Sequence, residues 1–239
     1  MLRPRLIAVL LIRNKGLVKT IQFADGKYVG DPLNAVRIFN EKEVDELIVL
    51  DIDATSKGQE PNYKLIALLA AECRMPLCYG GGVKNLEQVR KIVTLGVEKV
   101  AISSAAIDDP SFLSTCAESV GIQSIVAVVD VKRSRWRKRY EVYTHNGTRK
   151  TGKSLDELIP GLVAAGAGEI VINSIDNDGE MQGYDLELAK IARNLIDVPV
   201  TFVGGAGSLE DVAALFERVG IVGAAAGSLY VFKGRYRAV

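Results

Sequence analysis

Val44–Asp53 reads VDELIVLDID, and 123 residues further along the chain Ala167–Asp176 reads AGEIVINSID. The same offset relates Gly81-Gly82 to Gly204-Gly205. Internal repetition over such a distance is a signal about the whole architecture. It predicts that one half of the domain was duplicated. A site made by one half should therefore have a counterpart in the other half.

Around this repeat, short apolar runs alternate with segments of helical period. The runs are continuously apolar, as in strands of a parallel sheet that is buried on both faces. The predicted strands are Leu6–Ile12, Glu46–Ile52, Pro76–Tyr79, Lys99–Ile102, Ser124–Val131, Glu169–Ile175, Val200–Val203 and Val222–Ala226. Helices are predicted to open at Asp31-Pro32, Asn85, Asp109-Pro110 and Ser208. This pattern predicts a single (β/α)₈ TIM barrel over residues 1–239, made of two duplicated half-barrels. A doubly wound sheet is the alternative.

Three features depart from a plain barrel. Only Leu229–Val239 follow the last predicted strand, so the final helix is predicted to be short or missing. The connections Arg13–Gly30 and Lys132–Lys153 exceed the usual loop length of about 4–6 residues, and both follow strand ends on the catalytic face. The second contains an Asn146-Gly147 turn and is predicted to form a hairpin. Its basic cluster could contact an anion or be a solvated edge, and His145 is predicted to be exposed and without a catalytic role.

The composition limits the classes of function. Hydrophobic residues make up 48% of the 239 residues and charged residues 25%, which is typical of a soluble globular protein. Thirty basic residues against 29 acidic ones give no reason to expect a nucleic-acid or membrane partner. No run reaches the roughly 18 apolar residues of a membrane span. The three cysteines are odd in number and lack metal spacing, so we expect a reducing, cytoplasmic compartment and neither a metal nor a cofactor.

Glycine-rich turns follow the third and seventh predicted strands, at Gly80–Gly82 and Gly204–Gly207. Glycine lets backbone N–H groups approach a phosphate at a helix N-terminus. Small residues after the fourth and eighth strands would complete each cradle. The predicted phosphate-binding residues are Gly81, Gly82, Ser103, Ser104, Asp178, Gly179, Gly204, Gly205, Gly227 and Ser228. Two cradles on opposite sides of the barrel mouth would suit a phosphorylated small molecule with a phosphate at each end.

Acid–base candidates should point into the mouth from strand ends. Asp130 ends an apolar run, where a carboxylate is costly unless it is paired or functional, so it is predicted to be catalytic. Asp51 and Asp176 also lie at strand ends and are predicted to be polar residues of the mouth, with loop bracing as the alternative. When Leu6–Arg13 (LIAVLLIR) is aligned with Ile125–Lys132 (IVAVVDVK), the first strand of each half, Leu11 stands opposite Asp130. A pair of opposed carboxylates is therefore absent.

The other end of the predicted barrel carries four charges, which belong to Arg5, Glu46, Lys99 and Glu169. Glu46 and Glu169 are counterparts in the repeat. Each of the four residues lies at or next to the start of a strand, so we expect them together at the barrel floor. A ring of salt bridges that closes the floor is the simplest reading of this set.

These motifs, together with Leu17-Val18-Lys19 and Gly183-Tyr184-Asp185, resemble the cyclase subunit of imidazole glycerol phosphate synthase over essentially the whole chain. The resemblance implies that a separate glutaminase subunit docks at the barrel floor. Ammonia would pass up the barrel to a bisphosphate substrate, and a carbon–nitrogen lyase reaction would yield imidazole glycerol phosphate and an aminoimidazole carboxamide ribotide. It also implies that the four-charge ring is an ammonia gate. Lys19 would be a catalytic residue on a loop over the substrate.

The chain departs from that family's pattern at the mouth. The family's first catalytic aspartate falls on Leu11, a cysteine falls on Val9, and an asparagine falls on Ser103. Loss of one acid–base partner typically costs about 10²–10⁴-fold in rate. The chain also resembles a paralogous branch, the glycosyl amidation-associated proteins of surface-polysaccharide gene clusters. In that branch a barrel and a glutaminase are thought to supply ammonia for an acetamidino group on a sugar, with a third, ATP-dependent amidotransferase.

Three functions therefore stand as alternatives. The first is an ammonia-conducting subunit for sugar amidation, and the second is the histidine-pathway cyclase. The third is a non-catalytic scaffold that activates its glutaminase. A sugar-phosphate isomerase of the sister barrel family is disfavoured, since that chemistry also uses two opposed carboxylates.

Overall fold

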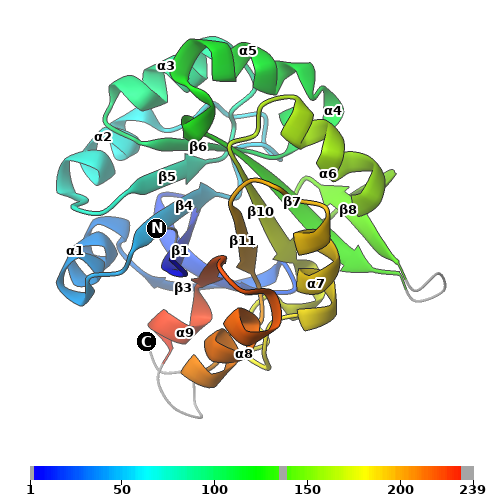
Figure 1. Ribbon diagram of the computed structural model, residues 1–239. Coiled ribbons are helices and arrows are strands. Elements are labelled where there is room, and N and C mark those ends of the chain that lie inside the picture. The colour runs from blue at the N-terminus through cyan, green and yellow to red at the C-terminus, as the bar shows by residue number, and fades with distance from the viewer. Residues whose placement is uncertain (1–2, 135–138, 233–239) are drawn as a thin grey trace.

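Eight parallel strands close into a barrel in the computed structural model of the chain, which describes residues 3–134 and 139–232 (Figure 1). The strands follow one another around the ring in the order β10-β11-β12-β1-β4-β5-β6-β7, and β7 pairs with β10 to close it. Their bounds are β1 Arg5–Arg13, β4 Glu46–Asp51, β5 Leu77–Gly80, β6 Lys99–Ile102, β7 Ile125–Arg133, β10 Glu169–Ser174, β11 Val200–Val203 and β12 Gly223–Ala226. The prediction of a (β/α)₈ TIM barrel is confirmed, and each predicted strand lies where the sequence placed it.

Helices surround the ring of strands (Figure 1). They are α1 Pro32–Lys42, α2 Tyr63–Glu72, α3 Leu86–Thr94, α4 Ser104–Asp108, α5 Ser111–Val120, α6 Leu155–Ala164, α7 Leu186–Asn194, α8 Leu209–Val219 and α9 Ser228–Val231, with short 3₁₀ turns η1 Ile122–Ser124 and η2 Ile175–Asn177. The Asp31, Asn85 and Ser208 side chains each cap the helix that the sequence predicted them to open. The final helix, α9, has four residues. Residues 233–239 lie outside the described part.

Alternation along the strands divides the apolar residues into two clusters. The larger cluster lies between the barrel and the helices. The smaller one fills the barrel interior and consists of Ile7, Val9, Ile48, Cys78, Ala101, Val126, Val128, Val171 and Ala225, with Leu11, Leu50 and Val203 packed against it. Because successive strand residues face opposite sides, the inner cluster takes every second residue of a strand. No helix within the described residues is both long and apolar enough to cross a membrane.

Two antiparallel hairpins extend the barrel at its mouth. β2 (Gly16–Ile21) and β3 (Ala24–Gly30) follow β1, and β8 (Tyr140–Thr144) and β9 (Arg149–Ser154) follow β7. The second hairpin confirms the prediction for that segment. The first was predicted only as a long connection. Part of the predicted basic cluster, residues 135–138, lies outside the described residues.

Each hairpin crosses the mouth to the opposite half-barrel. The backbone N–H of Gln22 donates to the Asp178 carbonyl oxygen at 2.9 Å. The Asn146 side chain donates to the Ile52 carbonyl oxygen at 2.6 Å. The two hairpins also approach each other at Gly147, where an added Cβ atom would lie only 3.2 Å from a ring carbon of Phe23. The duplicated halves therefore interlock above the barrel.

Candidate functional site

A cavity of about 400 Å³ opens at the carboxyl ends of the barrel strands. Its deep wall is the apolar inner cluster, and its rim carries polar side chains and glycine-rich turns. Ligand sites of TIM barrels occupy this end of the fold. The cavity is therefore the candidate site, and the predicted mouth residues can be located with respect to it.

Asp130 lies on β7 and lines the cavity. Its Oδ1 accepts a hydrogen bond from the Asn173 side chain at 3.2 Å. Burial raises the pKa of Asp130 to about 7, the Asn173 hydrogen bond opposes that rise, and the nearby charge of Asp178 adds to it. A carboxylate with a pKa close to neutral can both accept and donate a proton, which is what acid–base chemistry requires.

Lys19 lies on β2 and points into the same cavity. Only 5% of the residue is exposed, and its ammonium donates to the Val9 carbonyl oxygen at 2.6 Å. Burial lowers the pKa of Lys19 to about 8, while the Asp178 charge opposes this shift. Asp130 and Lys19 thus face one cavity with pKa values displaced toward neutrality from opposite sides. Such a pair is able to exchange protons with a ligand near neutral pH.

The predicted first phosphate cradle lies on one side of the mouth. Gly81, Gly82, Ser103 and Ser104 all line the cavity. Ser103 precedes α4 without capping it, and its hydroxyl is buried with no hydrogen-bond partner among the described residues. Gly81 has φ +117°, and a Cβ there would lie 2.3 Å from the carbonyl oxygen of Asp51. This side of the mouth combines a glycine turn with an unused hydroxyl.

The predicted second cradle faces the first across the cavity, because β11 and β12 lie opposite β5 and β6 in the ring of strands. All six of its residues line the wall: Asp178, Gly179, Gly204, Gly205, Gly227 and Ser228. Gly227 also meets the Lys19 side chain, because a Cβ there would lie 2.3 Å from the Lys19 ammonium. Asp178 is engaged by the first hairpin, through the Thr20 hydroxyl at 2.7 Å and the Phe23 N–H at 3.0 Å. The second cradle therefore has the Lys19 ammonium directly beside one of its glycines.

The two remaining aspartates of the predicted mouth differ. Asp51 lines the cavity, and its Oδ1 accepts the backbone N–H groups of Asp53 and Ala54 at 3.1 Å each. Burial raises the pKa of Asp51, and these N–H groups oppose the rise. Asp176 is not among the cavity-lining residues and accepts the Arg133 backbone N–H at 2.7 Å. Its placement corresponds to loop bracing, because that bond ties η2 to the end of β7.

Two residues that line the cavity were not expected there from the sequence. His145 was predicted to be exposed, but it is half-buried and lines the cavity beside Thr144, whose hydroxyl lies 3.1 Å from its Nδ1. The hairpin carries it there, which is a tertiary effect. Asn173 was not singled out from the sequence at all, although its counterpart position, Leu50, follows from the repeat. A polar residue among Ile172, Val171 and Ile170 was the available signal.

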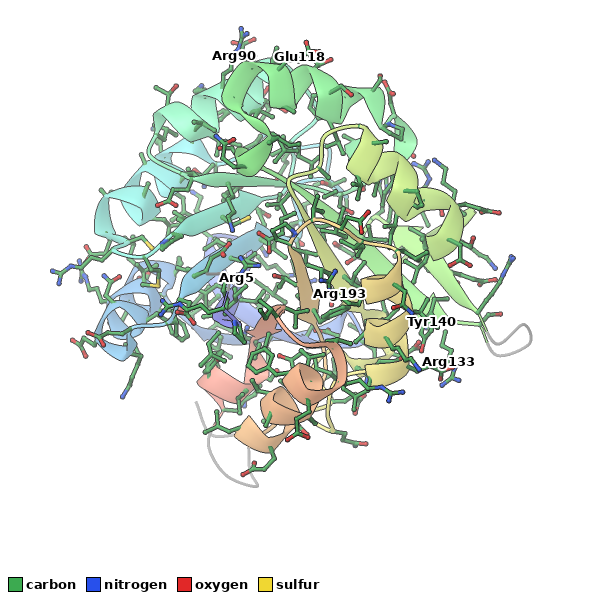
Figure 2. The ribbon with its side chains drawn as sticks, in the orientation of Figure 1. Arg5, Arg90, Glu118, Arg133, Tyr140 and Arg193 are labelled. Carbon is green, nitrogen blue, oxygen red and sulfur yellow. The ribbon has the colours of Figure 1, made fainter. Side chains whose placement is uncertain are left out.

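The four predicted floor charges form a closed ring of alternating sign. Arg5 contacts Glu46 and Glu169 at 2.6 Å each, and Lys99 contacts the same carboxylates at 2.9 and 2.8 Å. Thr201 also donates to Glu169, at 2.6 Å. Figure 2 shows Arg5 inside the ring of strands. The barrel axis is thus sealed at the floor by side chains.

Electrostatics hold this ring together. Burial alone would raise the pKa of Glu169, but the Arg5 hydrogen bond and the charges of Lys99 and Arg5 outweigh it and lower the pKa to about 2. Both glutamates are almost fully buried, whereas Arg5 and Lys99 keep about a fifth of their side chains exposed. The cations therefore face the floor surface, and the ring opens only if an ion pair is broken.

Nothing in the described residues resembles a metal centre, since no group of three or more histidine, cysteine, aspartate or glutamate side chains is placed to hold a metal ion. All three cysteines are free thiols.

Comparison with known proteins places the chain in a family. The model of the family described as "Histidine biosynthesis protein" matches residues 5–237. A Leptospira borgpetersenii protein named "Putative imidazole glycerol phosphate synthase subunit HisF" is 57% identical over the whole chain and 94% of its own length. A Pseudomonas aeruginosa protein, "Putative imidazole glycerol phosphate synthase subunit hisF2", is 52% identical over the whole chain and 95% of its length. "Imidazole glycerol phosphate synthase subunit HisF" of Limosilactobacillus fermentum is 36% identical over 98% of the chain and 89% of its length.

Proposed function

The chain belongs to the histidine biosynthesis protein family, and from this membership we propose that it is the ammonia-receiving synthase subunit of a glutamine amidotransferase complex. Ammonia from a separate glutaminase subunit enters at the floor and reacts with a phosphorylated ligand at the mouth. The observation that carries this proposal is the alignment on one barrel axis of a charged ring, an apolar interior and a polar cavity. Neutral ammonia suits such an interior better than an ion does, because an apolar wall penalises charge.

The floor supports a partner subunit. Leu6, Ile122 and Ile221 lie near the starts of β1, β7 and β12 and are exposed. Apolar side chains at an exposed surface mark possible protein contacts. We assign the glutaminase to this face, next to Arg5 and Lys99. A third, ATP-dependent amidotransferase would complete the pathway to an amidated sugar.

The mouth supports a phosphorylated small molecule as the acceptor. Two glycine cradles face each other, and the second has the Lys19 ammonium beside Gly227. The unused Ser103 hydroxyl offers a donor on the opposite side. Leu11 lines the cavity where the repeat places it opposite Asp130. With one carboxylate in place of two, we infer that the chemistry is altered, and the resemblance to the glycosyl amidation-associated branch then favours a role in forming an acetamidino group on a surface-polysaccharide sugar.

The second candidate is the histidine-pathway cyclase itself, a carbon–nitrogen lyase. Both cradles, Lys19 and Asp130 support it, because they suit a bisphosphate ligand. In this case Lys19, whose pKa burial lowers to about 8, would supply the second proton-transfer group. Both candidates share the barrel, the partner and the use of ammonia.

The deciding experiment measures turnover of the bisphosphate ribulosyl substrate with excess ammonium salt, for the wild type and Leu11→Asp. Turnover only in Leu11→Asp supports the amidation subunit, because the ligand cradle then survives without the original chemistry. Robust wild-type turnover identifies the cyclase. If neither protein turns over and the chain still raises the activity of a glutaminase, it is a non-catalytic scaffold. If neither protein turns over and no partner glutaminase responds, the proposal fails.

A further inference from the structure

The inner face of β10 changes character from floor to mouth. Glu169 belongs to the charged ring, Val171 belongs to the apolar inner cluster, and Asn173 lines the cavity. Asn173 as a residue is 8% exposed, and the carbonyl oxygen of its side chain is buried. Parallel pairing sets it beside Asp130 on β7. A buried carboxamide therefore marks the point where the apolar interior ends.

Only one of the two polar atoms of the Asn173 carboxamide has a hydrogen-bond partner among the described residues. Its Nδ2 donates to Asp130 Oδ1 at 3.2 Å. Because the amide nitrogen faces Asp130, the Asn173 carbonyl oxygen points elsewhere. That oxygen is buried and has no hydrogen-bond partner among the described residues. Buried polar atoms in folded proteins normally find a partner, so this acceptor calls for a ligand with an N–H or O–H group.

The wall below Asn173 narrows the choice of donor. Its members are aliphatic apart from Cys78, a weak donor. Such a wall offers nothing to solvate an ion and little to hold a sugar. A small neutral molecule that has passed the floor ring meets, at the cavity-lining residue Asn173, a side-chain acceptor on β10 that has no partner among the described residues. Ammonia has the size, the neutrality and the N–H groups that these surroundings select.

We propose that Asn173 binds neutral ammonia at the top of the barrel interior, with its carbonyl oxygen accepting an ammonia N–H while its amide nitrogen holds Asp130 alongside. Asn173 is then both an ammonia-binding residue and a positioning residue for Asp130. The inference rests on the proposed function in one respect, which is that ammonia reaches the mouth through the barrel. It names the residue that receives it.

Nuclear magnetic resonance tests the binding without any turnover. The side-chain amide signals of Asn173, identified by their absence in Asn173→Leu or Asn173→Asp, are followed while the intact protein is titrated with ammonium chloride. In alkaline buffer, where neutral ammonia is abundant, the signals should shift saturably. In acidic buffer they should not shift, and potassium chloride should have no effect in either buffer. The Asn40 amide, which donates to the Glu72 carbonyl oxygen on the outer surface, is the internal control and should stay unchanged.

No saturable shift in alkaline buffer, or an equal shift with potassium chloride, would overturn the proposal even if the protein proves to be an ammonia-using synthase. A shift caused by the bisphosphate ligand alone would show that the Asn173 oxygen serves that ligand instead. Because the readout is a chemical shift, its failure is distinguishable from failure of the proposed function, which is judged by turnover and by glutaminase activation.

Kinetics separate the two halves of the carboxamide. Asn173→Leu loses both, whereas Asn173→Asp keeps the acceptor and loses the donor. In the ammonia-driven assay, run in the Leu11→Asp background if the wild type is inactive, Asn173→Leu should raise the KM for ammonia roughly two- to tenfold, as loss of one neutral hydrogen bond predicts. Asn173→Asp should leave that KM within about twofold. Both should move the pH profile upward, because each removes a hydrogen bond that opposes the raised pKa of Asp130. An increase in the KM for the phosphorylated ligand alone would contradict the assignment.

Discussion

The hydroxyl of Thr20 donates a hydrogen bond to the Asp178 carboxylate at 2.7 Å and joins residues 158 positions apart in the chain. The Phe23 N–H donates to the same carboxylate oxygen at 3.0 Å. Lys19, the neighbour of Thr20, is thereby held over the cavity. One carboxylate of the second cradle thus closes the first hairpin over the mouth.

Asp178→Ala should release this hairpin. The Thr20 hydroxyl and the Phe23 N–H would lose their acceptor, so hydrogen exchange of residues 16–30 should accelerate and the free energy of unfolding should fall by about 1–3 kcal/mol. Hydrogen-exchange mass spectrometry measures the first effect. Glu187→Gln, which breaks an exposed ion pair with Arg133, is the control and should leave the exchange of that segment unchanged. Equal protection in Asp178→Ala and the wild type would show that other contacts hold the hairpin.

Lys99→Ala should separate the two nitrogen sources. Its ammonium bridges both glutamates of the floor ring, so its loss leaves a gap at the entrance but no change at the mouth. Glutamine-dependent activity with the partner glutaminase should fall more than activity driven by ammonium salt, and Glu46→Ala should behave alike. The ratio of the two activities within one variant is the measure, because breaking a buried ion pair also costs about 3–5 kcal/mol of stability. Arg37→Gln, on an exposed pair with Glu72, is the control. Equal loss of both activities would remove the gate role.

Asp130 should make the protein less stable as pH rises. Burial raises its folded-state pKa to about 7, whereas the unfolded value is near 3.8. The folded state therefore favours the protonated acid, so this stabilisation is complete below the unfolded pKa and is lost as pH rises through about 7. Asp130→Asn removes the charge and should raise the Tm at pH values above about 7 while leaving it nearly unchanged at about pH 4. Thermal unfolding at the two pH values measures the difference. The same Tm change at both would mean that Asp130 is not desolvated.

The turnover rate should also depend on the ionisation of Asp130, but it should increase with pH, whereas the stability decreases. If Asp130 accepts a proton, the rate should fall as pH drops through about 7, because the carboxylate is then lost. Asp130→Asn should reduce the rate by about 10²–10⁴-fold and remove this limb of the pH profile. A pH profile that survives in Asp130→Asn would assign the limb to another group.

Gly227→Ala should displace Lys19 without unfolding the barrel. The new methyl group would lie 2.3 Å from the Lys19 ammonium, which is the far end of a flexible side chain, and 3.2 Å from the Val9 carbonyl oxygen that the ammonium binds. The ammonium should therefore leave its place. We expect the Tm to change little and turnover to fall to the level of Lys19→Met. A Gly227→Ala enzyme with normal turnover would show that the ammonium position is not needed.

The barrel was predictable because its signals are local. Buried strands are continuously apolar, and the capping side chains of Asp31, Asn85 and Ser208 precede their helices in sequence. Glycine turns after strand ends locate the cradles in the same way. The repeat also allows the two halves of the sequence to be compared with each other, and this comparison identifies Leu11 as the counterpart of Asp130. Each of these features depends on a few neighbouring residues.

The contents of the mouth were less predictable. His145 was predicted to be exposed and instead lines the cavity, and Asp176, for which the sequence left a mouth role and loop bracing open, accepts the Arg133 N–H. For His145 the second hairpin decides the outcome by crossing to the other half-barrel, and for Asp176 the pairing of β10 with β7 brings the Arg133 N–H within reach. No local pattern encodes where a hairpin tip docks.

By itself, the sequence determined the barrel, its duplication, the floor charges and the absence of a second carboxylate at position 11, since these follow from period, spacing and residue type. The tertiary structure decided which of those groups share one cavity. Asn173 meets Asp130 because parallel pairing sets β10 beside β7. Lys19 meets Gly227 because β2 pairs with the end of β1 on the same edge that pairs with β12, which carries the hairpin over the mouth. Burial then moves the pKa values of Asp130 and Lys19 toward neutrality, and burial exists only once the whole barrel has closed.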